Sequence, residues 1–217
     1  SLHKSSDLFY FSTQICLFHI SCYHTYMETP DVCPVIPDER YIHWSVGPEE
    51  RVNLFECYVR DAMNDPLIQQ LAHQFASRNP SDPAQAILDG VHEIIEYALD
   101  CGNGSCEHLM KGRLIVESGK GDCKKKSIIV AAMYRIVGIP AKVVWLHQQD
   151  AGMDSNHVAV KRCNEAVPSG DKPTAVKVFY PTNAPSCDAG GWEGVETTLP
   201  GAKVGNDPYS ELERLCG

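Results

Sequence analysis

The chain has 217 residues, with 28 acidic against 19 basic side chains and a formal net charge of −9. This balance argues against nucleic acid and anionic membrane surfaces as partners, because both favour clustered lysine and arginine. No apolar stretch approaches the roughly 18 residues that a membrane-spanning helix needs, and the chain is long enough to bury one sizeable core. We therefore expect a single working domain that binds neither nucleic acid nor membrane.

The ten cysteines suggest a disulfide framework, but their spacing is irregular, and a core of this size needs no crosslinks to fold. If one cysteine is a nucleophile it must stay free, so complete internal pairing would be impossible. We therefore expect a reducing, cytoplasmic environment.

The N-terminal part differs in composition from the rest. Residues 1–26 hold only two charged side chains and lack the basic start and cleavage site of a signal peptide. Residues 30–48 contain four prolines, which indicates an extended arm. We expect residues 1–48 to be an N-terminal extension and arm, with 1–26 outside the working domain, and residues 49–217 to be that domain.

Three amphipathic helices are predicted after the arm. Residues 49–63 place apolar side chains at helical spacing. The Asp-Pro pairs at 65–66 and 82–83 each combine a capping residue with proline at the first helical position, so two further helices begin there. The apolar stripe of the third helix continues to residue 99, and a short strand is expected at 114–116.

The most informative stretch is GKGDCKKKS at residues 119–127, followed by a continuous apolar run that ends before Gly138. Its two glycines permit a sharp turn, Asp122 can cap the next helix, and Cys123 then falls in the first turn. Unpaired backbone N–H groups and the helix dipole at that point favour thiolate over thiol. The alternative is an inert core cysteine, the commonest role of this residue.

Two downstream residues complete a possible triad. His157 opens a β-branched strand, and Glu196 lies near the end of another at 192–198. A nucleophile at a helix start, a base on one strand and an orienting carboxylate on the next form a thiol version of the serine hydrolase triad. Because helices come first and strands later, the sequence predicts an α+β fold with an antiparallel sheet.

The segments GKGDCKKKSIIVAAMYRIVGIPAKVV, NHVAVK and W-x-x-x-ETT-x-PGA-x-x-G together resemble the transglutaminase-like cysteine hydrolase superfamily of papain-like fold. The resemblance is greatest to its small bacterial, archaeal and phage members. It implies N-terminal helices and a buried nucleophile helix packed on the antiparallel sheet. It also implies a peptide or protein substrate, no cofactor or metal, and a cytoplasmic or virion-associated location in a prokaryote or a phage-infected host.

The resemblance also assigns roles. Cys123 would attack a carbonyl, His157 would hold the proton and pass it to the leaving group, and Glu196 would orient the imidazole. Tyr97, near the end of the third helix in a Y-x-x-D pattern, would approach the oxyanion side, and Trp192 would line the substrate site. The alternative for Tyr97 is a ring packed in the core.

The third triad member has alternatives. Many relatives use an aspartate in a D-P-T setting, and this chain has Tyr180 at that place. Tyrosine cannot supply a carboxylate at neutral pH, so we prefer Glu196. If Glu196 is structural, Asn183 or Asp188 would orient the histidine.

The lysines at 124–126 depart from the family, whose members usually carry acidic residues there. Each lysine at a helix start opposes the dipole by roughly 0.3–1 kcal/mol. Either these side chains point to solvent, or their field favours the thiolate or attracts an acidic substrate.

The expected function is therefore thiol-dependent acyl transfer through a thioester, as a cysteine protease or amidase. The alternatives are a cross-linking transglutaminase, a catalytically silent structural or binding protein such as a phage virion component, and a cysteine-rich metal-binding module.

Overall fold

The computed structural model describes residues 33–43, 46–99, 106–150, 153–166, 177–188 and 190–205. Residues 1–26, expected to lie apart from the working domain, are outside these ranges. The elements in chain order are β1 (Glu39–His43), α1 (Pro48–Met63), α2 (Pro66–Ala76), α3 (Pro83–Ile94), β2 (Glu96–Tyr97), β3 (Cys106–Met110), α4 (Gly112–Ser118), β4 (Lys120–Gly121), α5 (Cys123–Ile136), β5 (Ala141–Asp150), β6 (Met153–Asn164), β7 (Lys177–Phe179) and β8 (Gly191–Val195).

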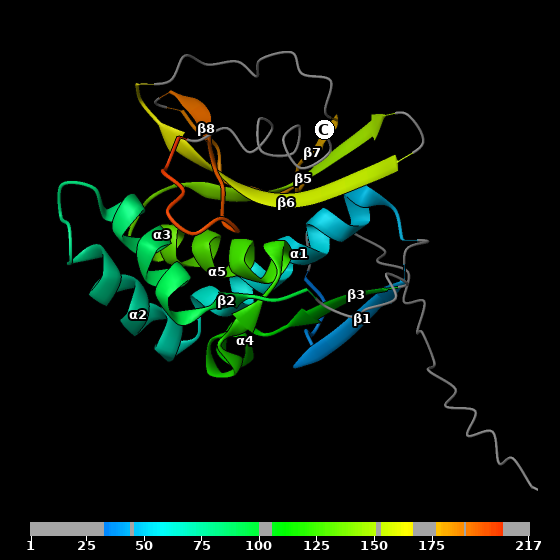
Figure 1. The fold of residues 1–217 in the computed structure, drawn as a ribbon, viewed down its shortest axis with the longest axis horizontal. Helices are drawn as coiled ribbons and strands as arrows, with labels where there is room; N and C mark the ends of the chain where they lie inside the picture. Colours follow the sequence, from blue (N-terminus) through cyan, green and yellow to red (C-terminus); the bar gives the residue numbers. More distant parts are fainter. Residues whose placement is uncertain are drawn as a thin grey trace, which may run out of the picture.

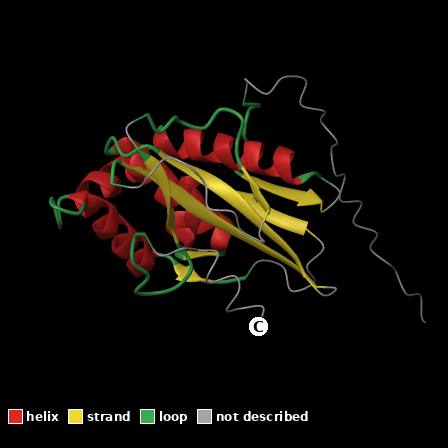
Figure 2. Cartoon of the chain, turned by 90° about the horizontal axis from the view of Figure 1, so that it is seen from above, coloured by secondary structure: helices red, strands yellow, loops and turns green. Residues whose placement is uncertain are grey.

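Within the described ranges, β7, β5, β6 and β8 form, in that order, an antiparallel sheet of four strands. The helices lie on one face of this sheet, and β1 and β3 form a separate antiparallel ribbon on the far side of the helices (Figure 1). Seen from above, the long strands run across the helices (Figure 2). The predicted α+β fold with an antiparallel sheet is thereby confirmed. None of the described helices is both long and apolar enough to cross a membrane.

Helix α5 is the centre of the core. It packs against β5 and β6 on one side and against α1, α2 and α3 on the others. Its residues from Lys124 to Tyr134 are all buried. Phe55 of α1 stacks on Trp145 of β5, with ring centroids 6.0 Å apart, and so joins the outer helix to the sheet. The predicted burial of the nucleophile helix on every side is confirmed, and Gly138, with φ of +84°, follows its end.

The predicted helix starts are confirmed by their caps. Asp65 accepts a hydrogen bond from the backbone N–H of Leu67 at 2.8 Å, and Asp82 accepts one from Gln85 at 3.1 Å. In both cases proline occupies the first turn, where its missing N–H would have had no partner.

The predicted end of the third helix is wrong. Helix α3 stops at Ile94, and Tyr97 lies on the short strand β2, which pairs in parallel with β4. The backbone N–H groups of Glu96 and Ala98 donate to the carbonyls of Gly119 and Gly121, at 2.8 and 3.1 Å. These hydrogen bonds to the turn before α5 take the place of the bonds that a further turn of α3 would have made.

The strand expected at 114–116 is also wrong, because those residues lie within helix α4. Ile115 is fully buried, and the helix ends at Gly119, which adopts the left-handed conformation with φ of +64°. This conformation favours glycine at a helix C-terminus, so Gly119 ends α4 as well as opening the turn before α5.

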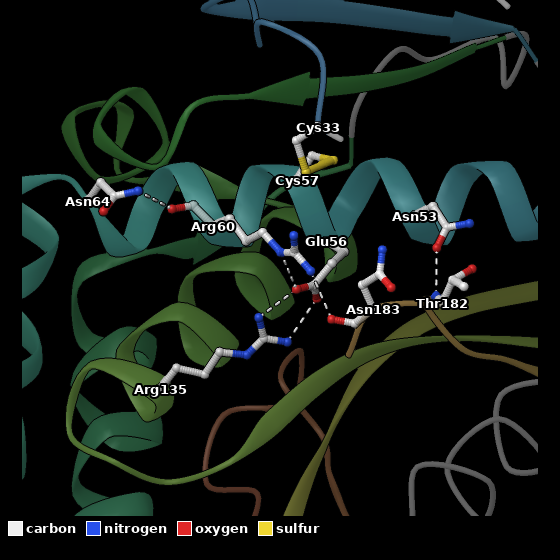
Figure 3. Close-up of a disulfide and its surroundings, with 9 residues drawn as sticks. All are labelled: Cys33, Asn53, Glu56, Cys57, Arg60, Asn64, Arg135, Thr182 and Asn183. Carbon is white, nitrogen blue, oxygen red and sulfur yellow. Dashed lines mark hydrogen bonds and ion pairs between the residues drawn. A yellow bond between two sulfur atoms is a disulfide. The ribbon is translucent and has the colours of Figure 1, made fainter. Parts of the chain in front are cut away.

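The arm is tied to the rest of the domain at two places. Strand β1 pairs with β3 over five residues, from Glu39 opposite Met110 to His43 opposite Cys106. A disulfide between Cys33 and Cys57 then joins the arm to the middle of α1 (Figure 3).

A second disulfide joins Cys163 to Cys187, so four of the described cysteines are paired and Cys123 is free. Irregular spacing did not reveal these pairs, because each joins segments that meet only in the folded chain. Disulfides are rare in reducing compartments. The two bonds therefore count against the reducing environment that the sequence suggested.

A buried ion pair holds α1 to α5. The carboxylate of Glu56 accepts hydrogen bonds from both terminal nitrogens of Arg135, at 2.7 and 2.8 Å, and from Nε of Arg60 at 3.1 Å (Figure 3). Arg60 also donates to the backbone carbonyl of Asn183 at 2.9 Å, and Arg135 to that of Ala141 at 2.7 Å. One carboxylate thus fixes two arginines that reach the loop after β7 and the start of β5.

Replacing Glu56 by glutamine should therefore lower the free energy of unfolding by about 3–5 kcal/mol, because the buried Arg135 would lose its counter-charge. Glu50→Gln, on an exposed position of the same helix, should change it by less than about 0.5 kcal/mol. Urea denaturation under non-reducing conditions measures both variants, and equal stabilities would contradict the assigned role of Glu56.

Candidate active site

The nucleophile turn forms as its sequence predicts. Asp122 caps α5 by accepting a hydrogen bond from the backbone N–H of Lys125 at 3.2 Å, and Cys123 is the first helical residue. The two glycines of the turn act differently. Gly119 supplies the left-handed conformation, whereas a Cβ at Gly121 would lie 3.0 Å from the Cβ of Lys125, so Gly121 permits a close backbone approach. Cys123, which is half-buried, therefore stands at the start of the central helix, where the first backbone N–H groups have no partner within the helix.

His157 and Glu196 form a buried pair. His157 Nε2 lies 2.8 Å from Glu196 Oε2, and the two residues are 7% and 1% exposed. Burial alone lowers the pKa of His157, but hydrogen bonding to Cys123 and to Glu196, together with their charges, outweighs burial and raises that pKa to about 10. The imidazole therefore stays protonated at neutral pH, and it interacts with both the sulfur and the carboxylate.

Glu196 is held ionised by its other neighbours. Burial raises the pKa of this carboxyl, but the hydrogen bonds from His157 and Thr198 outweigh burial and lower it. Glu196 Oε1 accepts from both the backbone N–H, at 2.7 Å, and the hydroxyl of Thr198. Because Val195 of β8 is paired with Val160 of β6, the next residue, Glu196, comes within reach of His157.

Thr197 joins the loop after β8 to helices α5 and α3. Its hydroxyl lies 2.9 Å from that of Ser127 on α5, and its carbonyl accepts from His92 Nε2 on α3 at 3.0 Å. Ser127 in turn donates to the carbonyl of Val158 on β6 at 3.0 Å. Sequence reasoning missed His92, Ser127 and the two threonines. Their only signal was the ETT triplet, which we used for Glu196 alone.

Tyr97 lies beside the nucleophile although it is not on a helix. Its position on β2 is opposite Gly121, and its side chain is 42% exposed. Burial of the phenol, with the charges of Cys123 and Asp122, raises the pKa of Tyr97 to about 12. The phenol therefore remains an O–H donor at neutral pH.

Trp192 lies farther along the sheet. Its ring is 3.9 Å from Lys142 Nζ, and Lys142 is paired with Lys161, four residues beyond His157 on β6. The described contacts thus place the indole with Lys142, and they do not bring it to the three triad residues.

The alternative third members have other surroundings. The hydroxyl of Tyr180 accepts from Lys161 Nζ at 3.0 Å, the carbonyl of Asn183 accepts from Arg60, and Asp188 is exposed. Glu196 is the carboxylate that the structure brings to His157.

The three lysines after Cys123 are buried, so the possibility that they point to solvent is wrong. Lys124 Nζ forms ion pairs with Glu107 on β3, at 2.9 Å, and with Asp122. Burial lowers the pKa of Lys124, but these two carboxylates outweigh it and raise the pKa above its ordinary value. Glu107 from a distant strand and the neighbouring Asp122 thus compensate the positive charge of Lys124, which the helix dipole disfavours.

Lys125 contributes a second link to the ribbon. Its Nζ lies 3.3 Å from His108 Nδ1, and His108 Nε2 lies 3.3 Å from Glu39 Oε2. The start of α5 is therefore tied to both β1 and β3. Among the described side chains, no group of three His, Cys, Asp or Glu could hold a metal ion.

Comparison with known proteins identifies the family. The family model for the transglutaminase-like superfamily matches residues 69–192, which is more than half of the chain. The matched range includes Cys123 and His157 and ends before Glu196. No curated protein matches the chain.

Two solved structures also match. A "putative protease" from Parabacteroides distasonis is 12% identical with a TM-score of 0.42, over 66% of this chain and 31% of its own. A "putative cysteine protease" from Cytophaga hutchinsonii is 15% identical with a TM-score of 0.39, over 74% of this chain and 53% of its own. The chain thus spans less than two thirds of the length of either structure. On the family match, the chain belongs to the transglutaminase-like superfamily.

Proposed function

We propose that the chain is a thiol-dependent acyl-transfer enzyme, a cysteine protease or amidase that acts on peptide or protein substrates. The observation that carries the proposal is the buried His157–Glu196 pair, 2.8 Å between Nε2 and Oε2, whose imidazole also interacts with Cys123. A nucleophile, a base and an orienting carboxylate in this order are what covalent acyl transfer requires.

In the proposed mechanism the Cys123 thiolate attacks the substrate carbonyl carbon, and the carbonyl oxygen becomes an oxyanion. The protonated His157 then donates its proton to the leaving amine as the carbon–nitrogen bond breaks, which leaves a thioester on Cys123. Water, deprotonated by the now neutral imidazole, attacks the thioester, and its breakdown releases the acid and restores the Cys123 thiolate beside the protonated imidazole. Glu196 holds the imidazole in place and stabilises its positive charge whenever it is protonated.

The oxyanion would form at the start of α5. The backbone N–H of Cys123 is the first donor, because it is among the groups that the helix leaves unpaired. The Tyr97 hydroxyl is the candidate second donor, since its phenol stays protonated and lies in the field of Cys123. An amine in place of water would give transamidation by the same first half-reaction.

Cys123→Ala should abolish cleavage of a casein or peptide library, because the proposed thioester forms on the sulfur of that residue. Circular dichroism should show an unchanged fold. A mass increase on Cys123, trapped with an activated ester of a peptide acid, would show the acyl-enzyme directly. Equal turnover by the two forms, or no turnover by either, would favour a binding protein that retains the fold.

Glu196→Gln should lower kcat by a factor on the order of 10²–10⁴, because a neutral amide cannot stabilise the imidazolium or fix its orientation. Glu193→Gln is the matched control: Glu193 lies on β8, three residues before Glu196, and pairs with Arg162 of β6, so its replacement should leave kcat within about twofold. Equal losses in the two variants would remove Glu196 from the mechanism.

The raised pKa of His157 also predicts a pH-dependent stability. Its pKa rises on folding from 6.5 to about 10, so protonation of His157 stabilises the folded state fully below pH 6.5. That contribution is lost as the pH rises through 10. The difference in free energy of unfolding between wild type and His157→Gln should therefore shrink between these two pH values, as followed by urea denaturation. A difference that is constant with pH would contradict the charged imidazole.

A further inference from the structure

Glu196 lies just beyond the end of strand β8, where strand pairing no longer holds the backbone. The last pair of the ladder joins Val195 to Val160, and Glu196 is the first residue after it. The chain then runs from the sheet toward α3 and α5 (Figure 1). The pairing of β8 brings Glu196 within reach of His157, but the exact place of its carboxylate also depends on how the following residues are held.

Thr197, the next residue, is held by hydrogen bonds from two helices. Its carbonyl accepts from Nε2 of His92 on α3 at 3.0 Å, and its hydroxyl lies 2.9 Å from that of Ser127 on α5. Because one contact is made by the backbone and the other by the side chain, the two together restrict both the position and the rotation of this residue. The backbone that carries the Glu196 side chain is therefore fixed at its very next residue.

The contact with Thr197 leaves the other ring nitrogen of His92 without a partner. A carbonyl oxygen only accepts, so Nε2 carries the proton that is donated. Burial lowers the pKa of His92 below its ordinary value, so the ring is neutral at pH 7 and Nδ1 is an acceptor. That buried atom has no hydrogen-bond partner in the part of the chain that the structure describes. A buried polar atom without a partner lowers stability. An apolar side chain would avoid this loss but could not donate to Thr197, so the bond explains His92 better than packing does.

Helix α3 holds the same loop at a second place, two turns before His92. Nε2 of Gln85 donates to the carbonyl of Ala202 at 3.1 Å, and its Oε1 accepts from the backbone N–H of Val204 at 2.8 Å. These contacts lie at the far end of the loop, whereas that of His92 is made directly beside Glu196. Gln85 therefore fastens the loop without holding the part that carries the carboxylate.

We propose that His92 is a positioning residue of the active site: by donating to the carbonyl of Thr197, it holds Glu196 where its carboxylate meets the imidazole of His157. Its effect on turnover rests on the proposed acyl-transfer function, but its effect on the His157–Glu196 pair does not. Without this bond the backbone at Thr197 would move, and the 2.8 Å contact between Nε2 of His157 and Oε2 of Glu196 would lengthen. A longer contact stabilises the imidazolium less, so His157 would lose its proton at a lower pH.

The test is the titration of His157, followed by NMR of the full chain labelled with 13C- and 15N-histidine. The signal of His157 is the one that His157→Gln lacks. His92→Phe keeps a ring but removes the donor, so the pKa of His157 should fall by about one unit from its wild-type value of about 10. His92→Gln places an amide N–H near the position of Nε2 and should restore the wild-type titration. Gln85→Met removes both bonds to the far end of the loop and should leave the titration unchanged.

Turnover of a peptide substrate provides a second measurement. His92→Phe should lower kcat by a factor of about 10–100 and keep KM within about twofold, because it disturbs the orientation of the imidazole and not the binding of substrate. His92→Gln should recover most of the lost kcat. Gln85→Met, although it loses more hydrogen bonds to the loop, should keep both constants within about twofold.

A titration of His157 that is unchanged in His92→Phe, or that shifts equally in Gln85→Met, would overturn the proposal. If His92→Phe does not fold, the 15N shifts of the His92 ring in wild type decide, with His92→Gln identifying its signals. Nε2 should carry the proton and Nδ1 should not, and the opposite tautomer would overturn the proposal. Normal turnover with an unshifted titration refutes only the role of His92, whereas a shifted titration without turnover in wild type refutes only the acyl-transfer function.

Discussion

The whole site depends on one buried carboxylate that remains ionised. Removing Glu196 from water costs several kcal/mol unless its charge is compensated. The structure compensates it with a protonated imidazole and two donors from Thr198. The register of β8 on β6 brings the carboxylate to His157. The pairing of two strands therefore determines whether the imidazole can carry a charge beside Cys123.

The start of α5 presents the opposite problem, since three lysines follow Cys123 where a helix dipole favours anions. Nearby carboxylates compensate the positive charges of these lysines. Asp122 and Glu107 enclose Lys124, and Glu39 reaches Lys125 through His108. The ribbon of β1 and β3 thus supports the nucleophile turn, and the arm that the sequence suggested as an extension supplies one of its charges.

The sequence predicted correctly the features that depend on neighbouring residues, namely the helix starts and the turn before Cys123. Asp65 and Asp122 cap the helices that were expected from them, and the turn before Cys123 forms at its glycines. The wrong predictions concern residues whose conformation or burial depends on partners far away in the sequence. Tyr97 lies on a strand because Gly119 and Gly121 accept its neighbours' N–H groups, and Lys124 is buried because Glu107 comes from β3. No local pattern marks His92 or Ser127, since their partner Thr197 lies 70 or more residues away.

The two disulfides fasten the segments that supply these charges. Cys163 lies near the end of β6, the strand that carries His157, and Cys187 precedes β8, which leads into Glu196. Cys33, in the arm before β1, is joined to Cys57 of α1. Each bond closes a loop with a sequence separation of 24. By restricting the unfolded chain, each bond raises the free energy of unfolding by about 3 kcal/mol. Reduction of the two disulfides would therefore remove a constraint on the segments that position Glu196 and Glu107, and it would not alter the sulfur of Cys123. A chain built in this way keeps its site best ordered where disulfides persist, which is the reverse of the compartment that its cysteine spacing suggested.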